Sequence, residues 1–151
     1  MKKFKKEVIK YSKKLNATNL SALRSGNISV RAKESGVDGF YITPSGRKYS
    51  SLKPKDIIFV SLKGVYDKKK GKPSSEWRFH QDIYTNKAEA RAIVHAHSPH
   101  ATAVSSHGKP IPAFHYMVAL AGGNDIKCAD YATFGTSELS KNIINSLENR
   151  K

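Results

Sequence analysis

The amino-acid sequence predicts an α/β protein, a layered domain built on a mixed or antiparallel sheet. Three observations lead to this prediction. An amphipathic helical pattern opens the chain, short apolar segments separated by turn residues follow, and helical and extended patterns then alternate to the end. A chain of 151 residues is long enough to bury a core. We expect one domain over residues 1–151, with no internal repeat and no linker.

The first half of the chain predicts one helix and three strands. Residues 3–15 carry an apolar side chain every three or four positions, which indicates an amphipathic helix with lysines on its other faces. These side chains are Phe4, Val8, Tyr11 and Leu15. Extended segments follow at residues 28–31, 39–43 and 57–60, and the last is apolar throughout, so we expect it to be buried on both faces. A proline–serine–glycine turn at residues 44–46 ends the second strand.

Helical and extended patterns alternate in the second half. The expected elements are a helix opening at residues 73–76, a strand at 92–97, a helix from 98 to near Gly108, a helix-compatible segment at 113–121, a strand at 126–132 and a last helix capped by Thr136. In the first of these helices serine caps the N-terminus and Glu76 lies in the first turn. The last helix has an apolar face, formed by Leu139, Ile143, Ile144 and Leu147.

The charge balance and the cysteine content limit the classes of function. The chain carries 27 Lys and Arg against 12 Asp and Glu, and its net charge of +15 attracts polyanions and small anionic substrates alike. No zinc finger, helix-turn-helix or aromatic–basic motif accompanies this charge, so a solvated lysine-rich surface is favoured over nucleic-acid binding. The single cysteine, Cys128, is typical of a reducing cytosol. No secretory signal and no run of roughly 20 apolar residues is present, so we expect a cytoplasmic protein.

The His95-Ala96-His97 motif is the strongest local indication of chemistry. Side chains two apart on a strand point to the same face, so both imidazoles can reach one metal ion, and zinc commonly uses such ligands. Surface histidines, or histidines hydrogen-bonded in a core, give the same pattern, so the motif alone leaves both interpretations open. His100 in the next helix either supports the pair or has no role.

Glu76 and three turns form a second group of candidates. A carboxylate beside Trp77 and Phe79 could have a raised pKa and act as a general acid or base, although an exposed acid at a helix start is the simpler interpretation. Short polar side chains and open backbone amides that suit a phosphate occur in three turns, at Gly26-Asn27, Ser45-Gly46 and Ser74-Ser75. Each alone is a common turn.

Six motifs in order along the chain resemble the class II aldolase/adducin family. They are GNISVR at 26–31, ITPSG at 42–46, PSSEWRFH at 73–80, VHAH at 94–97, IPAFHYM at 111–117 and CADYATFGT at 128–136. The SSEWRFH and CADYATFGT runs are more similar to the fuculose-phosphate aldolase branch than to the epimerases or dehydratases of the family. The resemblance implies a three-layer α/β/α fold with an antiparallel sheet between helical layers, usually assembled as a homotetramer with active sites at subunit interfaces.

The resemblance also assigns expected roles. Zn²⁺ ligands are expected at His95 and His97, with Glu76 as the catalytic acid/base that can approach the metal. Tyr116 matches a tyrosine that reaches into the neighbouring subunit's site. The phosphate of the substrate is expected to meet Asn27, Ser45, Gly46, Ser74 and Ser75. The implied reaction is cleavage of a phosphorylated ketose, of the L-fuculose 1-phosphate type, to dihydroxyacetone phosphate and an aldehyde such as lactaldehyde.

Three alternatives stay open on the same scaffold: a pentulose-phosphate 4-epimerase, a methylthioribulose-phosphate dehydratase and a non-catalytic adducin-like binding module. Two departures from the family pattern bear on them. Residues 19–25 lack the glycine and threonine usual before the first phosphate turn. The family's later His-His-Gly motif, which supplies a third histidine ligand, has no counterpart, since the last histidine is His115. We therefore expect a chain incomplete at its C-terminus, with weak zinc binding and little aldolase activity by itself.

Overall fold

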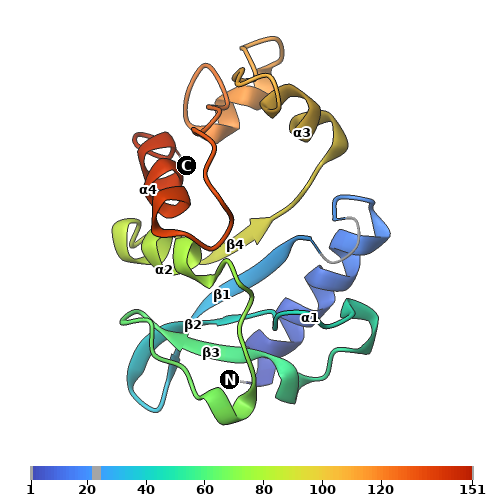
Figure 1. The fold of residues 1–151 in the computed structure, drawn as a ribbon, viewed down its shortest axis with the longest axis vertical. Helices are drawn as coiled ribbons and strands as arrows, with labels where there is room; N and C mark the ends of the chain where they lie inside the picture. The colour runs from blue at the N-terminus through green and yellow to red at the C-terminus, as the bar shows by residue number, and fades with distance from the viewer. Residues whose placement is uncertain (1, 22–24, 151) are drawn as a thin grey trace.

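A four-stranded antiparallel sheet forms the centre of the protein, with the strand order β3-β2-β1-β4 (Figure 1). The computed structural model describes residues 2–21 and 25–150. The strands are β1 (Asn27–Glu34), β2 (Val37–Ile42), β3 (Ile58–Ser61) and β4 (Ala92–His95). Each neighbouring pair is antiparallel, which confirms the expectation of a mainly antiparallel sheet and the positions of the first three predicted strands.

Helices cover both faces of this sheet, as Figure 1 shows. Helix α1 (Lys2–Ala17) packs on β1 and β2, whereas α2 (Trp77–Asn86) packs on β2 and carries α4 (Ser137–Ser146) on its outer side. Successive residues of β2 point to opposite faces. Tyr41 therefore belongs to the core under α1, and Phe40 and Ile42 belong to the core under α2. The α/β fold with a sheet between helical layers is confirmed.

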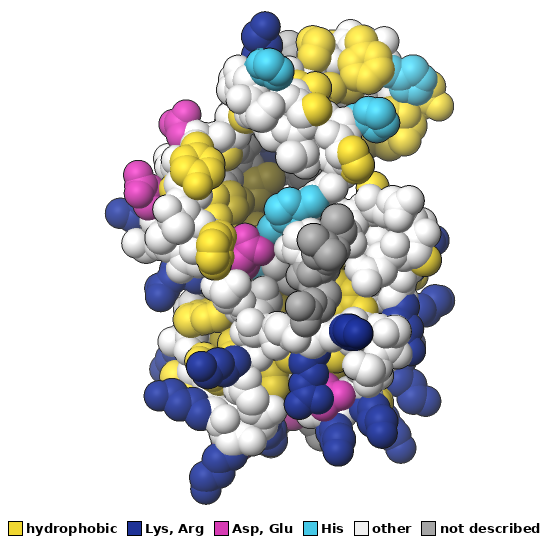
Figure 2. Space-filling model, turned by 45° about the vertical axis from the view of Figure 1, so that its right-hand side comes forward, with side chains coloured by type: hydrophobic (Ala, Val, Ile, Leu, Met, Phe, Trp, Pro, Cys, Tyr) yellow, Lys and Arg dark blue, Asp and Glu magenta, His cyan; other side chains and the backbone are white. Residues whose placement is uncertain are grey.

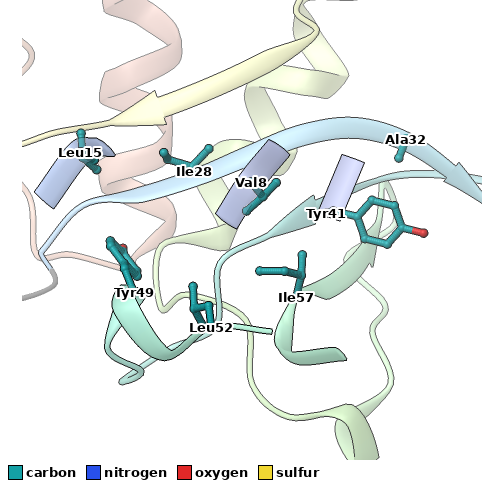
Figure 3. Close-up of a cluster of buried hydrophobic side chains, with 8 residues drawn as sticks. All are labelled: Val8, Leu15, Ile28, Ala32, Tyr41, Tyr49, Leu52 and Ile57. Atoms are coloured by element: carbon teal, nitrogen blue, oxygen red, sulfur yellow. The ribbon is translucent and has the colours of Figure 1, made fainter. Parts of the chain in front are cut away.

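The core under α1 lies between this helix, the sheet and the segment that follows β2 (Figure 3). Its members come from α1, from β1 and β2, and from the segment between β2 and β3. They are Val8, Leu15, Ile28, Ala32, Tyr41, Tyr49, Leu52 and Ile57. This cluster fixes the loop after β2, because Tyr49 and Leu52 anchor that loop in the core.

The buried face of α1 differs from the predicted one. Val8 and Leu15 are buried as expected, but Phe4 is 39% and Tyr11 43% exposed. Ser12 is fully buried instead. Its hydroxyl donates to the Ile9 carbonyl at 3.0 Å, so its polar group has a partner inside the helix and burying it costs little.

The second half contains the larger corrections. The predicted strand at 126–132 is wrong: only a single bridge forms there, between Ile111 and Ile126. A strand needs a neighbour, and β4 pairs only with β1 among the described residues. The segment at 113–121 forms a 3₁₀ helix, η5 (Tyr116–Ala121), and the helix after β4 is short, α3 (Pro99–Ser105).

Two boundary corrections concern the site itself. The strand predicted at 92–97 ends at His95. Helix α2 begins at Trp77, so Glu76 is the capping residue before the helix and not part of its first turn. Ser74 still contributes to this helix start, because its hydroxyl accepts a hydrogen bond from the Glu76 amide at 3.3 Å. Among the described residues no helix is long and apolar enough to cross a membrane.

Candidate active site

Three candidate side chains meet where β1 begins, β4 ends and α2 begins. Asn27 lies directly opposite His95 in the β1–β4 pairing. Its amide nitrogen Nδ2 donates to Glu76 Oε2 at 2.8 Å, and the same oxygen lies 2.9 Å from His95 Nδ1. The Glu76 and His95 side chains are only 13% and 23% exposed. A carboxylate, an imidazole and an amide are thus held in one partly buried group.

His97 stands beside this group although the strand has ended. Its backbone amide donates to the Leu20 carbonyl at 2.7 Å, which holds the chain after β4 against the segment that follows α1. The ring centroids of His95 and His97 are 4.8 Å apart. The ring of Phe79 stands edge-on to His95, with centroids 5.4 Å apart. The two imidazoles of the sequence motif therefore lie side by side.

The pKa of Glu76 reflects opposing influences. Burial acts to raise this pKa, because it disfavours the charged carboxylate. The hydrogen bond and charge of His95, the hydrogen bond from Asn27 and the charge of His97 act in the other direction, and together they lower the pKa below its usual value. The sequence left a raised pKa open as one interpretation of this carboxyl, and the structure contradicts it. The aromatic neighbours supply the burial, but the polar partners outweigh it.

The donor atoms at the site are of the kinds that zinc binds. Two imidazoles lie side by side, and one of them touches a carboxylate through Nδ1, which leaves its Nε2 as a ligand atom. Residues 2–21 and 25–150 contain no group of three or more His, Cys, Asp or Glu side chains already gathered to hold a metal ion. The residues therefore fit part of a zinc site that needs a further ligand.

A small polar cavity of about 70 Å³ adjoins Glu76. The loop after β2 and the segment before α2 form it together, because the Ser45 amide donates to the Lys72 carbonyl at 3.0 Å and the Ser74 amide to the Thr43 carbonyl at 2.9 Å. Gly46 has φ 70°, a conformation that favours glycine. The lining brings together all five residues predicted to bind phosphate, namely Asn27, Ser45, Gly46, Ser74 and Ser75.

Two other predicted candidates lie away from this group. Tyr116 is 78% exposed in η5, where it lines a separate cavity with Phe114 and His115. His100 is exposed on α3, and no ring contact joins it to the two histidines of the motif. The departure noted at residues 19–25 falls in part on 22–24, which lie outside the described residues.

Arg47 and His80 were missed by the sequence reasoning. Arg47 follows the glycine of the phosphate turn and lines the small cavity. His80 lies in the first turn of α2, four residues after Glu76, and bonds to Asn27. The helical spacing from Glu76 could have pointed to His80. Nothing local distinguishes Arg47 from other exposed cations.

The face that carries the histidines is hollowed. Figure 2 shows histidine and acidic side chains adjoining in a hollow between the upper and lower parts of the molecule. A much larger cavity, of about 860 Å³, lies elsewhere, along β3 and the loop after it, and none of the predicted site residues lines it. The site is therefore placed by its chemistry and not by cavity size.

Comparison with known proteins gives consistent matches. Residues 6–151 match the family model described as class II aldolase and adducin N-terminal domain. The chain is 46% identical over 144 residues to a 5-methylthioribulose-1-phosphate/5-deoxyribulose-1-phosphate aldolase of Rhodospirillum rubrum, covering 95% of this chain and 63% of the relative. It is 44% identical over 149 residues to the L-fuculose phosphate aldolase of Escherichia coli K12, covering 99% of this chain and 67% of that protein.

The solved structures agree with these relatives. An L-fuculose 1-phosphate aldolase superposes with a TM-score of 0.89 at 39% identity, covering 98% of this chain and 68% of that one. The chain thus spans about two thirds of the length of the curated relatives it matches.

Proposed function

Since the chain belongs to the class II aldolase and adducin family, we propose that it forms the catalytic part of a metal-dependent aldolase that cleaves a ketose 1-phosphate. The products are dihydroxyacetone phosphate and an aldehyde, which is lactaldehyde if the substrate is L-fuculose 1-phosphate. The observation that carries this proposal is the position of the Glu76 carboxylate. Its Oε2 lies 2.9 Å from His95 Nδ1, and the side chain lines the edge of a small polar cavity.

Each part of the site has a proposed task. The turns around the small cavity hold the phosphate through backbone amides and short polar side chains, and Arg47 adds positive charge. Glu76 then lies beside the bound substrate. As the carbon–carbon bond breaks, the substrate hydroxyl that becomes the aldehyde carbonyl loses its proton. The Glu76 carboxylate takes up this proton and delivers it to the carbon that was bonded to the departing aldehyde.

The metal is proposed to be zinc, held by His95 and His97 with Glu76 close by. It would supply Lewis-acid stabilisation of the negative charge that develops on the substrate oxygens. His95 Nδ1 faces the Glu76 carboxylate, which fixes the ring and directs Nε2 away from that contact.

The oligomer enters the proposal through Tyr116. This side chain is 78% exposed and lies apart from the Glu76 group. We assign it to the site of a neighbouring copy in a homotetramer, where its hydroxyl would hold the oxygen of the aldehyde part of the substrate.

Glu76→Gln tests the proton transfer. The amide keeps the shape of the side chain and cannot take up or deliver the proton, so we expect proton exchange into dihydroxyacetone phosphate to fall by about 10²-fold or more. Exchange of the carbon-bound proton in heavy water, followed by NMR on the zinc-loaded chain, measures this half-reaction even where overall cleavage is slow. Glu89→Gln, at an exposed acid, serves as the control. A loss of less than about threefold in Glu76→Gln argues against the role.

Substitution of the histidines tests the metal proposal. His95→Ala removes an imidazole ligand, so zinc binding measured by calorimetry should be lost, whereas His107→Ala, at an exposed histidine outside the group, should bind zinc as the wild type does. Equal affinity in the wild type and in a His95→Ala/His97→Ala double variant would show that zinc binds elsewhere or not at all.

A second candidate substrate is favoured by one relative. The Rhodospirillum rubrum protein at 46% identity is named for 5-methylthioribulose 1-phosphate and 5-deoxyribulose 1-phosphate. These ketose 1-phosphates differ from L-fuculose 1-phosphate in the aldehyde part. The comparison of kcat/KM for L-fuculose 1-phosphate and 5-deoxyribulose 1-phosphate decides between them. Absence of cleavage of both substrates together with absence of proton exchange into dihydroxyacetone phosphate would contradict the proposed function.

A further inference from the structure

His80 is fully buried behind the candidate site, and both of its ring nitrogens have partners. Nδ1 lies 2.7 Å from Ser29 Oγ, and Nε2 bonds to Asn27 Oδ1. Ser29 Oγ in turn lies 2.8 Å from the Tyr84 hydroxyl. These four side chains form a continuous chain of hydrogen bonds, Tyr84–Ser29–His80–Asn27, which runs through the interior and ends at Glu76.

The direction of every bond in this chain can be worked out. Asn27 Oδ1 can only accept, so His80 Nε2 carries the proton and donates it. In the neutral ring Nδ1 must then accept from the Ser29 hydroxyl, which leaves Ser29 Oγ to accept from Tyr84. The ring is neutral because full burial, and secondarily the charge of His95, lowers its pKa to about 3. All donors therefore point toward Asn27.

The chain of hydrogen bonds and the Glu76 carboxylate agree on one orientation of the Asn27 amide. With Oδ1 bound to His80, the amide nitrogen Nδ2 is turned toward Glu76 Oε2 at 2.8 Å and His95 Nδ1 at 3.2 Å. A flipped amide would present Oδ1 to the Glu76 carboxylate, an acceptor against an acceptor. Within the chain of bonds only His80 contacts the amide oxygen, because Ser29 and Tyr84 reach Asn27 only through the imidazole.

We infer that His80 is a positioning residue for the proposed aldolase: it holds the Asn27 amide nitrogen toward Glu76 and thereby holds the Glu76 carboxylate in its working position. The inference rests on the proposed function for its catalytic consequence. The contrasting interpretation is that His80 only fills the core between Phe40 and Phe79, whose rings stack on it with centroids 6.4 and 4.5 Å away.

Two variants distinguish a role of His80 in positioning Asn27 from a role in filling the core. His80→Met fills the space but removes both hydrogen bonds, whereas His80→Gln carries an amide that can donate to Asn27 in place of Nε2. Because polar partners behind a reacting group typically contribute 10–100-fold, we expect kcat of the zinc-loaded chain to fall by about that factor in His80→Met. The KM of His80→Met should stay within about twofold of the wild-type value. The kcat of His80→Gln should recover to within about threefold of the wild-type value.

A matched control accounts for lost stability. Ile83→Ala truncates another buried residue of α2 that takes no part in the chain of hydrogen bonds. Its kcat should equal that of the wild type even though it unfolds more easily. A kcat loss in Ile83→Ala as large as in His80→Met, or a wild-type kcat in His80→Met, would overturn the inference.

A spectroscopic measurement tests the same inference without turnover. Long-range proton–nitrogen NMR on the histidine-labelled chain should show His80 as the neutral Nε2–H tautomer between pH 5.5 and 8. The side-chain amide protons of Asn27 should exchange with solvent faster in His80→Met than in His80→Gln. An Nδ1–H tautomer would reverse the chain and overturn the inference. If the wild type catalyses neither proton exchange nor cleavage, the proposed function fails, while the tautomer and the Asn27 exchange still decide whether His80 orients the amide.

Discussion

Arg47 brings a positive charge to the small polar cavity. It lines this cavity together with the serines of the phosphate turns, and it also lines an adjoining cavity of about 280 Å³ with Lys70 and Lys72. Its guanidinium nitrogen Nη1 lies 3.4 Å from Asp56 Oδ1, an ion pair in which the arginine side chain is 62% and the aspartate 9% exposed. The exposure of the arginine means that water screens part of its charge.

Arg47→Gln should therefore weaken phosphate binding moderately. An exposed charged contact contributes about 1 kcal/mol, so we expect the Kd for dihydroxyacetone phosphate to rise about fivefold. Arg47→Lys keeps the positive charge and should lose less affinity for dihydroxyacetone phosphate, because only the forked hydrogen-bonding geometry of the guanidinium is missing. Chemical-shift titration of the labelled chain measures these affinities.

The matched control for Arg47 is its neighbour Lys48, which lines neither cavity. Lys48→Gln removes the same net charge at almost the same place in the chain. If Lys48→Gln and Arg47→Gln raise the Kd equally, the effect belongs to the general positive field of the protein and not to a contact in the cavity.

At the scale of elements, Gly26 is the point where α1, β1 and β4 come together. A Cβ atom placed on this glycine would lie 2.5 Å from the His95 carbonyl oxygen and 2.8 Å from Leu15 Cδ2. The first of these atoms is backbone at the end of β4, and it can move only if the strand moves. The absent side chain of Gly26 thus allows β4 to place its histidine next to Asn27.

Gly26→Ala should disturb both stability and the site. Overpacking in a closed interior typically costs about 1–3 kcal/mol, and the strain should displace the end of β4. Urea unfolding measures the loss of stability, and the NMR shifts of the His95 ring report the displacement of β4.

Gly108→Ala is the comparison for Gly26→Ala. Gly108 has φ 64° and no atom within 4 Å of an added Cβ, so its substitution costs only the strain of a left-handed backbone. The His95 shifts should be unchanged in this variant. Unchanged His95 shifts in Gly26→Ala as well would contradict the placement of β4 against this glycine.

At the scale of the whole molecule, the positive charge is unevenly spread over the face that Figure 2 shows. Lysine and arginine side chains gather over the lower part of the face in Figure 2, away from the hollow with the histidines. Two lysine-rich segments of the sequence, residues 2–14 and 68–72, come together in the fold, because Lys5 of α1 and Lys70 of the 3₁₀ helix Lys68–Lys70 line the same cavity. The sequence separates these segments by some fifty positions, and the fold joins them.

Buried His80 links the stability of the whole fold to pH. Its pKa is about 3 in the folded protein, against 6.5 for an ordinary histidine. Between these values the unfolded chain binds a proton that the folded chain does not, so the free energy of unfolding decreases as the pH falls below 6.5. The loss of unfolding free energy should approach about 1.4 kcal/mol per pH unit. At pH 5 the accumulated loss should be about 2 kcal/mol.

His80→Gln separates this effect from all other titrating groups. Glutamine has no proton to gain, so the variant should lose stability less steeply than the wild type as the pH falls from 7 to 4. Urea unfolding of both proteins across this range measures the difference. Parallel stability curves for the two proteins would mean that His80 is not buried in its neutral form.

The sequence by itself determined the local features of this protein. The positions of the first three strands, the turn at residues 44–46 and the Thr136 cap all follow from patterns within a few residues, and the structure confirms them. The hydroxyl of Thr136 accepts from the Leu139 amide at 3.2 Å, as a capping threonine does. The candidate residues Glu76, His95 and His97 were likewise chosen from side-chain chemistry and spacing.

Only the tertiary structure decided which groups these residues meet. The strand predicted at 126–132 does not form, because extended residues need a neighbouring strand that no local pattern supplies. Asn27 was chosen for its turn, yet its side chain is engaged with Glu76, His80 and His95, which come from two other elements of the fold. The lowered pKa of Glu76 has the same origin. Burial, hydrogen bonds and nearby charges act through space, and their balance depends on contacts between residues far apart in the sequence.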